Sequence, residues 1–266
     1  MRRAGLVVGQ TLELVREVVA VGMSTRELNA IAERCIREAG AEPSFLGYHG
    51  FPGSLCVSVN DEIVHGIPGD RVLQDGDVVS VDCGAIVDGW HGDAAVTVVV
   101  GLADPGDELL LATTEEAMWR GIAALRAGGR LHDVGAAVED LVVARAGDGG
   151  AHSAQGYGII EEYVGHGIGT EMHQDPQVPN HRVRDKGVRV RQGLVVAIEP
   201  MLTRGGPQTR VLDDDWTVVS TDSSNAAHFE QTVAVGEHGL WVLTALDGGE
   251  QQLARLGAPY APLDLP

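Results

Sequence analysis

Alternation of hydrophobic and polar residues predicts a β-hairpin between residues 77 and 100. Its two arms, DVVSVD and AAVTVVV, are rich in valine and otherwise small residues, which is typical of strands. Between them, Asp88 and Gly89 favour a type I′ turn, because both central residues of that turn need a positive φ. A two-residue turn here places Val87 opposite Trp90.

Two acidic residues lie on the same face of this hairpin. In the predicted register Asp93 faces Gly84, and Asp82 lies one diagonal step away. Diagonal neighbours are roughly 7–8 Å apart at the backbone, within reach of a shared ion. The hairpin alone leaves two interpretations open: one solvated Asp and one that caps a turn, or a pair that binds a cation.

Helical periodicity predicts two pairs of helices. The first pair begins with a helix over about residues 4–20, ended by Gly22. The next helix opens with a capping box, Ser24 and Glu27, and ends at Gly40. Its apolar residues recur at helical spacing: Leu28, Ile31, Ala32, Cys35 and Ile36.

The second pair repeats this scheme in the middle of the chain. A long helix is expected over residues 104–129, closed by two glycines, and another over residues 131–147. A weak alignment of the two pairs suggests an α+β fold of two related halves, each a helix pair followed by antiparallel ribbons. We expect one domain over residues 1–266, with halves of roughly 1–103 and 104–250 and a surface tail over 251–266. Residues 204–227 predict a loop and a hairpin.

Composition narrows the class of protein. The 266 residues are 44% hydrophobic, enough for a core, and the net charge of −19 argues against a nucleic-acid or anionic-membrane surface. Three cysteines are a sparse, odd set, as expected in a reducing compartment. The N-terminus lacks the apolar run of a signal peptide, and no window is long enough for a membrane span. We therefore expect a cytoplasmic protein.

Four further segments carry metal-binding side chains in apolar surroundings. His65 precedes a Gly-Ile-Pro turn, and His166 lies between glycines, which let a backbone approach a ligand closely. Glu199 is the only charge in GLVVAIEPML, and Glu230 lies in the alternating strand AHFEQTVAVG. A lone Glu in a core strand is costly unless it is paired or bound to metal. The alternatives are an Arg partner for each Glu and a core hydrogen bond for each His, but no Lys or Arg lies within the two Glu strands.

Together the motifs resemble the type I methionine aminopeptidases, which have the pita-bread fold. The resemblance runs from about residue 3 to residue 244, and it depends on five segments in this order: SFLGYHGFPGSLCVSVNDEIVHGIP, VDCGAIVDGWHGD, EEYVGHGIG, AIEPM and HFEQT. It implies two curved antiparallel sheets with helix pairs, arranged around a dinuclear metal site.

The resemblance assigns five ligands by position. Asp82 would chelate one metal, His166 and Glu199 the other, while Asp93 and Glu230 would bridge the two. It implies two divalent ions, and oxygen ligands with a single nitrogen suit Mn, Fe, Co or Zn. Metal-activated water would then remove the N-terminal methionine of nascent proteins when the second residue is small.

Three catalytic residues follow from the same resemblance. Glu199 would also carry a proton to the leaving amine. His65 and His173 match the family's two active-site histidines that are not ligands, placed to stabilise the tetrahedral oxyanion or to hold the scissile amide. We expect a bend between His166 and His173, since Gly167 and Gly169 disfavour a regular strand there.

The resemblance also implies a pocket for the methionine side chain. Its members here are Tyr48, Phe51, Cys56, His65 and Trp216. A thioether gains from contact with aromatic edges and sulfur. Two positions depart from common family residues: Phe45 replaces a cysteine and Met172 lies where a Phe is often found. His91 lies near Asp93, but the family does not use it as a ligand.

Two other functions are compatible with parts of the pattern. An Xaa-Pro peptidase shares the five ligands but usually adds an N-terminal domain, and a non-catalytic binding protein on this scaffold typically loses ligands. Only 31 residues separate Glu199 from Glu230, which leaves no room for the large insertion of type II enzymes. We expect a monomer that acts on nascent polypeptides near the ribosome and binds neither nucleic acid nor membrane.

Overall fold

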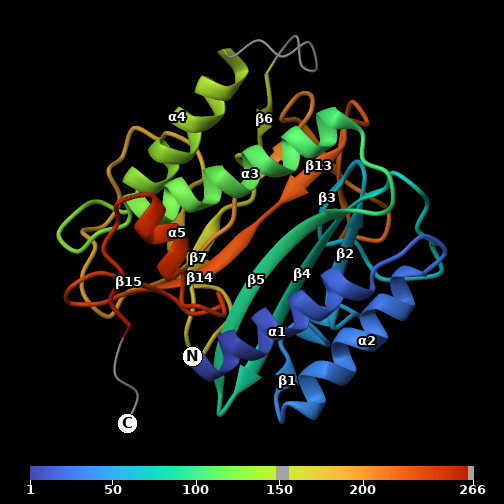
Figure 1. The fold of residues 1–266 in the computed structure, drawn as a ribbon, viewed down its shortest axis with the longest axis horizontal. Coiled ribbons are helices and arrows are strands. Elements are labelled where there is room, and N and C mark those ends of the chain that lie inside the picture. Colours follow the sequence, from blue (N-terminus) through green and yellow to red (C-terminus); the bar gives the residue numbers. More distant parts are fainter. Residues whose placement is uncertain (148–155, 263–266) are drawn as a thin grey trace.

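A curved antiparallel sheet forms the centre of the molecule (Figure 1). The computed structural model describes residues 1–147 and 156–262. Within these ranges the main sheet has nine strands: seven follow the order β1-β4-β5-β14-β9-β7-β8, and β2 and β15 pair with β4 and β14. Their bounds are β1 (Glu42–Pro43), β2 (Leu55–Val59), β4 (Val78–Val87), β5 (Trp90–Val99), β7 (Gly165–Gly167), β8 (Gln174–Val178), β9 (Val195–Ile198), β14 (Glu230–Val235) and β15 (Leu240–Val242).

The hairpin of β4 and β5 has the predicted register. Val87 faces Trp90 and Asp93 faces Gly84. Asp88 and Gly89 have φ values of 51° and 77°, as a type I′ turn requires. The Asp-Gly pair therefore fixes which side chains of the two strands share a face.

Two smaller sheets extend the fold. One has the order β13-β10-β6 and the other β11-β12-β3. Their bounds are β3 (Glu62–Val64), β6 (Gly158–Ile159), β10 (Met201–Thr203), β11 (Thr209–Val211), β12 (Val218–Ser220) and β13 (Ala226–His228). The antiparallel pair of β11 and β12 confirms the hairpin expected within residues 204–227.

Helix pairs pack against the main sheet, and α1 crosses β4 and β5 (Figure 1). The helices are α1 (Arg2–Val18), α2 (Thr25–Glu38), α3 (Pro105–Ala124), α4 (Asp133–Gly147) and α5 (Glu250–Arg255). In α2 the capping box is present: the Ser24 side chain accepts from the Glu27 amide, and the Glu27 carboxylate accepts from the Ser24 amide. The buried faces of α1, α2, α3 and α4 share one hydrophobic core with β4, β5 and β14.

Three predicted helices have different limits in the structure, among them the one expected over residues 131–147, which begins at Asp133. The first helix starts and ends two residues earlier, at Arg2 and Val18. The third stops at Ala124 instead of reaching residue 129, because the following segment pairs with residues 188–190, which lie outside the strands. There the Gly128 amide donates to the Val190 carbonyl, and Arg130 forms an isolated bridge with Arg189.

The C-terminal segment contributes more than the surface packing expected from its Gly and Pro content. It contains α5, and Leu253 of this helix is fully buried in the core. Tyr260 bridges Leu240 in parallel, which ties the segment to β15.

The two strands that carry Glu199 and Glu230 are each interrupted, which the sequence pattern did not predict. β9 ends at Ile198, and after Glu199 and Pro200 the chain continues as β10 in a different sheet. Proline has no N–H to donate to a ladder, so the main sheet ends there. A second break falls at Phe229, between β13 and β14. Both glutamates therefore lie where the chain passes between two sheets.

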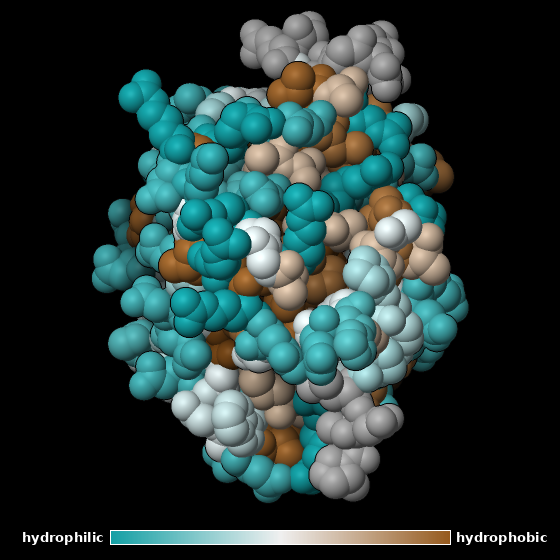
Figure 2. Space-filling model, turned by 90° about the vertical axis from the view of Figure 1, so that its left-hand side faces the viewer, coloured by the Kyte–Doolittle hydropathy of each residue, from teal (hydrophilic) through white to brown (hydrophobic). Residues whose placement is uncertain are grey.

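On the side of the molecule shown in Figure 2, hydrophobic side chains show mainly in gaps between polar ones. Among the residues that the structure describes, no helix combines the length and the apolar character that a membrane crossing needs.

Candidate metal centre and its cavity

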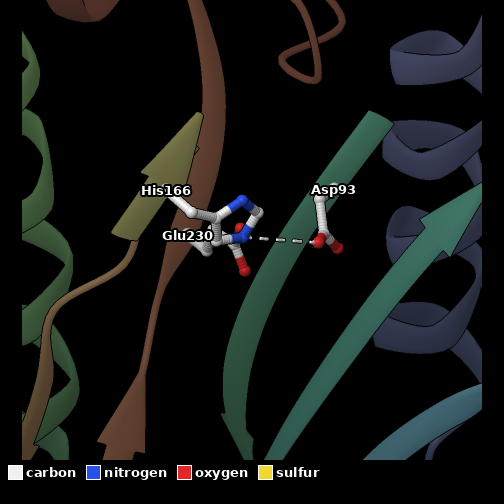
Figure 3. Close-up of side chains that lie close together, drawn as sticks. All are labelled: Asp93, His166 and Glu230. Carbon is white, nitrogen blue, oxygen red and sulfur yellow. Dashed lines mark ion pairs between the residues drawn. The ribbon is translucent and has the colours of Figure 1, made fainter. Parts of the chain in front are cut away.

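Five neighbouring strands of the main sheet each supply one predicted ligand. The sheet order β4-β5-β14-β9-β7 carries, in turn, Asp82, Asp93, Glu230, Glu199 and His166, with Glu199 directly after the last residue of β9. Figure 3 shows Asp93, His166 and Glu230 pointing toward one another from three strands.

The strand register explains why these side chains share a face. Asp82 and Glu230 both pair with Ala95 of β5, one from each side. Asp93 is two residues from Ala95, and alternate side chains of a strand point to the same face. The three carboxylates therefore surround one small side chain, which leaves room between them.

The other two ligands follow from the next pairs. Gln231 pairs with Ile198, which brings Glu199 beside Glu230. Gly167 pairs with Val196, which brings His166 beside Ala197, on the same face as Glu199. A second alanine thus lies beneath the site.

The glycines on either side of His166 serve strand packing. A Cβ at Gly165 would lie 2.3 Å from the Ala197 carbonyl oxygen, and one at Gly167 would lie 2.3 Å from that of Asp175. Both contacts are with neighbouring strands, so the glycines allow close approach between backbones.

The imidazole of His166 presents an unprotonated nitrogen to the carboxylates. Its Nδ1 lies 3.0 Å from the Gly167 carbonyl oxygen, which can only accept, so Nδ1 carries the hydrogen. The lone pair on Nε2 then faces the site, 3.5 Å from Glu199 Oε1 and 3.9 Å from Asp93 Oδ2 (Figure 3). A ring nitrogen fixed in this way is typical of metal-ligating histidines.

The carboxylates lack the partners that burial normally demands. Asp82 Oδ1, Asp93 Oδ1 and Glu230 Oε1 are buried without a hydrogen-bond partner among the described residues. The alternative of an arginine partner for each Glu does not hold there: the ion pairs of Glu199 and Glu230 are with histidines only. Orphaned anionic oxygens beside a free imidazole nitrogen fit a divalent cation.

Without a cation, burial makes the charged forms of these side chains unfavourable. It raises the pKa of Asp82 to about 7. Burial first, and then the charge of neighbouring carboxylates, raises the pKa of Asp93, Glu199 and Glu230 well above the ordinary range. Burial also lowers the pKa of His166 to about 4. The metal-free site therefore favours protonated carboxyls and a neutral imidazole.

These residues line a cavity of about 280 Å³. All predicted site residues contribute to its wall: Tyr48, Phe51, Cys56, His65, Asp82, Asp93, His166, His173, Glu199, Trp216 and Glu230. The structure thus brings every predicted residue to one place, while the role of each remains a prediction.

The two additional histidines enter the cavity from bends. The chain turns between β7 and β8, as expected, so that the rings of His166 and His173 meet edge to face with centroids 4.3 Å apart. Tyr48 Oη lies 2.9 Å from His173 Nδ1. His65 has a φ of 62°, and burial followed by the charge of His173 lowers its pKa to about 4.

Aromatic and sulfur-containing side chains form the remaining wall. A buried cluster unites Phe45, Phe51, Cys56 and Met172, with Tyr48, Ile67 and Trp216 packed against it. The rings of Phe51 and Trp216 meet edge to face at 5.1 Å. The two positions that depart from common family residues therefore keep the pocket apolar.

Two further histidines near the ligands differ in their surroundings. His91 is engaged by Ser44, whose Oγ lies 3.1 Å from its Nδ1, and it is absent from the cavity wall. His228 was missed by the sequence reasoning. It is only 1% exposed, its pKa is lowered to about 3 by burial, and its Nε2 lies within 4 Å of Glu199 and Glu230. Its position two residues before Glu230 was the available signal, since alternate residues share a face.

The sequence of this chain is similar to those of known metallopeptidases. Residues 1–237 match metallopeptidase family M24. Methionine aminopeptidase 1 from Mycobacterium tuberculosis is 50% identical over 245 residues, which cover 92% of this chain and 91% of that protein. Methionine aminopeptidase 1 from Bacillus subtilis is 45% identical over 244 residues, covering 92% and 94% respectively.

Solved structures show the same fold. A methionine aminopeptidase from Thermotoga maritima superposes with a TM-score of 0.86 at 38% identity, covering 92% of this chain and 95% of the other. A prolidase from Pyrococcus furiosus gives a TM-score of 0.69 at 22% identity, and the match covers 91% of this chain and 62% of the prolidase. The similarity to the prolidase is one of fold.

Proposed function

The chain belongs to metallopeptidase family M24, and we propose that it removes the N-terminal methionine of polypeptides by metal-dependent hydrolysis. The observation that carries this proposal is the cavity, where five predicted ligand side chains, three of them with an orphaned buried oxygen, adjoin an apolar, sulfur-containing pocket. The similarity to methionine aminopeptidases over most of the chain supports the same activity.

Two divalent cations fit the ligand set. Asp82 would hold one, His166 and Glu199 the other, and Asp93 and Glu230 would be shared. When bound, such cations supply Lewis-acid polarisation of the scissile carbonyl and lower the pKa of the attacking water. Oxygen ligands with a single nitrogen suit Mn, Fe, Co or Zn.

Glu199 is the proton carrier of this proposal. Its carboxylate lines the cavity beside the other predicted ligands, where the attacking water and the scissile bond would lie. It accepts a proton from the water that attacks the carbonyl carbon. It then donates this proton to the leaving nitrogen as the bond between methionine and the second residue breaks. The products are free methionine and a polypeptide with a new amino terminus.

His173 and His65 orient the peptide bond. Tyr48 Oη lies 2.9 Å from His173 Nδ1, and with the hydroxyl as donor the Nε2–H of this ring is free to donate to the carbonyl oxygen as it becomes an oxyanion. Burial lowers the pKa of both histidines, so they act as neutral hydrogen-bond donors.

The apolar pocket selects the first residue. Aromatic edges from Tyr48, Phe51 and Trp216 and the sulfur of Cys56 surround the space next to the ligands. A thioether gains from such contacts, whereas a charged side chain would lose its hydration. The second residue is small in the favoured substrates.

An Xaa-Pro peptidase is the nearest rival function, and one assay separates the two. Met-Ala-Ser and an Ala-Pro dipeptide are each incubated with the protein, with and without a chelator. We expect cleavage of Met-Ala-Ser alone, its loss in chelator and its recovery when a divalent cation is added. Cleavage of Ala-Pro in preference would support the rival, and no cleavage of either would support a non-catalytic binding protein.

We also propose a cellular setting and an oligomeric state for the protein. The substrates are nascent polypeptides near the ribosome in the cytoplasm, and the protein acts as a monomer. Light scattering coupled to size exclusion tests the oligomeric state, where a mass near 28.0 kDa is expected.

A further inference from the structure

A histidine that the chemistry above does not use lies beside two of the ligands. His228 ends β13 and pairs with Met201 at the start of β10. Its amide donates to Thr97 Oγ1 at 2.9 Å, and its carbonyl oxygen accepts from the same hydroxyl at 2.7 Å. Because both backbone groups are held, the sheet fixes the position from which the imidazole extends.

The free nitrogen of His228 points at two carboxylates. Nε2 lies 3.9 Å from Glu199 Oε2 and 3.8 Å from Glu230 Oε2, and it has no hydrogen-bond partner among the described residues. Both distances exceed a hydrogen bond by about 1 Å, which a small rotation of either carboxylate removes. A polar nitrogen buried to this degree normally has a partner, and these oxygens are the nearest charged atoms.

Glu199 lies between two imidazoles. Its Oε1 is 3.5 Å from His166 Nε2, while its Oε2 faces His228. His166 belongs to the cavity wall with the other four ligands, whereas His228 does not. His228 therefore faces the two carboxylates without lining the cavity itself.

We propose that His228 is a positioning residue whose Nε2–H donates to the outer oxygens of Glu199 and Glu230 and holds both carboxylates in their ligating orientation. The proposal rests on the metal-dependent function given above and adds a residue outside the five ligands. When the Oε2 atom of each glutamate is held by this hydrogen bond, the Oε1 atom is already oriented toward a bound cation. Loss of such a partner typically costs 10–100-fold in metal affinity or activity.

Two substitutions separate positioning from direct ligation. In His228→Gln the side-chain amide nitrogen can occupy the place of Nε2 and donate, but an amide nitrogen is a poor metal ligand. In His228→Met a flexible apolar side chain fills a similar volume without a donor. The probe is Co²⁺, titrated calorimetrically into protein stripped with a chelator, with the visible absorption of the loaded protein recorded alongside.

We expect His228→Met to bind Co²⁺ about 10–100-fold more weakly than wild type. His228→Gln is expected to stay within about threefold of wild type and to leave the Co²⁺ absorption bands unchanged, since the ligands themselves are unaltered. Rescue by the amide is a result that a merely space-filling role would not give.

His91 provides a matched control. It lies two residues before Asp93, as His228 lies two residues before Glu230, and it is also buried, but its partner is Ser44. His91→Met should keep the Co²⁺ affinity within about twofold of wild type, because no ligand loses a contact. If His91→Met lost as much Co²⁺ affinity as His228→Met, the effect would come from a general disturbance of packing at the site, and the proposal would be overturned.

Other results of the same titrations would exclude the positioning role or the proposed function. Equal loss in His228→Gln and His228→Met, with altered Co²⁺ bands in the former, would make His228 a ligand and overturn the positioning role. Wild-type affinity in His228→Met would remove any role, and His228→Leu replaces this variant if it does not fold. Wild-type protein that binds no divalent cation would refute the proposed function itself.

Discussion

Replacing His173 with alanine separates transition-state stabilisation from metal binding. The Nδ1 atom of His173 is engaged by Tyr48 at 2.9 Å, and its ring meets that of His166 edge to face. In the described part of the chain His173 forms no ion pair with a carboxylate, whereas His166 Nε2 lies 3.5 Å from Glu199. We therefore expect His173→Ala to keep the metal affinity of wild type.

The cost should fall on the chemical step. His173 offers a single N–H to the cavity, and loss of one oxyanion donor typically lowers kcat by about 10²–10³, or about 3–4 kcal/mol. KM should move much less, because the contact strengthens as negative charge develops on the carbonyl oxygen. His166→Ala should instead lose metal affinity and activity together, since it removes a ligand.

The assay measures kcat and KM on Met-Ala-Ser at saturating metal, and metal affinity by calorimetry, for both variants and wild type. The assignment of His173 fails if His173→Ala loses metal as His166→Ala does. It also fails if kcat of His173→Ala stays within about threefold of wild type, since one donor is expected to matter far more.

Three further expectations follow from the site. Glu230→Ala should lose a shared ligand and most metal-dependent activity, and tight calorimetric binding of two cations by this variant would contradict the bridging role. Met-Gly peptides should be cleaved far faster than Met-Lys peptides, so equal turnover would disprove the small-residue preference. Burial raises the pKa of Asp82 to about 7, so folded metal-free protein keeps protons that unfolded chains have released, and its stability falls as pH rises through about 7. The lowered pKa values of His65 and His166 oppose this until unfolded histidines have lost their protons, somewhat above about pH 6.5. The raised pKa values of Asp93, Glu199 and Glu230 act in the same direction as that of Asp82 and outweigh the histidines. Thermal unfolding in chelator should therefore show a lower Tm at pH 8 than at pH 6.5, and a Tm that does not fall would refute this linkage.

Local signals in the sequence predicted the parts of the fold that depend on local chemistry. The Asp88-Gly89 pair permits one turn type with one register, so the positions of Asp82 and Asp93 on a shared face followed directly. The capping box at Ser24 likewise fixed the start of α2. Both cases involve residues a few positions apart, whose geometry the rest of the chain does not alter.

Features that depend on distant partners could not be predicted in this way. The third helix ends at Ala124 because Gly128 pairs with Val190, a partner far along the chain. Apolar runs around Glu199 and Glu230 indicate strands, but they do not tell which sheet each part joins. His228 was missed for this reason: its nearness to Glu199 arises only once β13 pairs with β10. The resemblance to a family supplied the ligand roles, which periodicity alone left open.

The order of strands in the main sheet has a consequence during synthesis. β4 and β5 form a local hairpin that can fold early, but the partner of β5 on its other side is β14, which follows α3 and α4 in the chain. Until β14 emerges, the edge of the valine-rich β5 has unpaired N–H and C=O groups, and such edges promote aggregation of partly made chains. The arrangement that gathers the five predicted ligands on one face thus also leaves the half-synthesised protein dependent on protection of that edge.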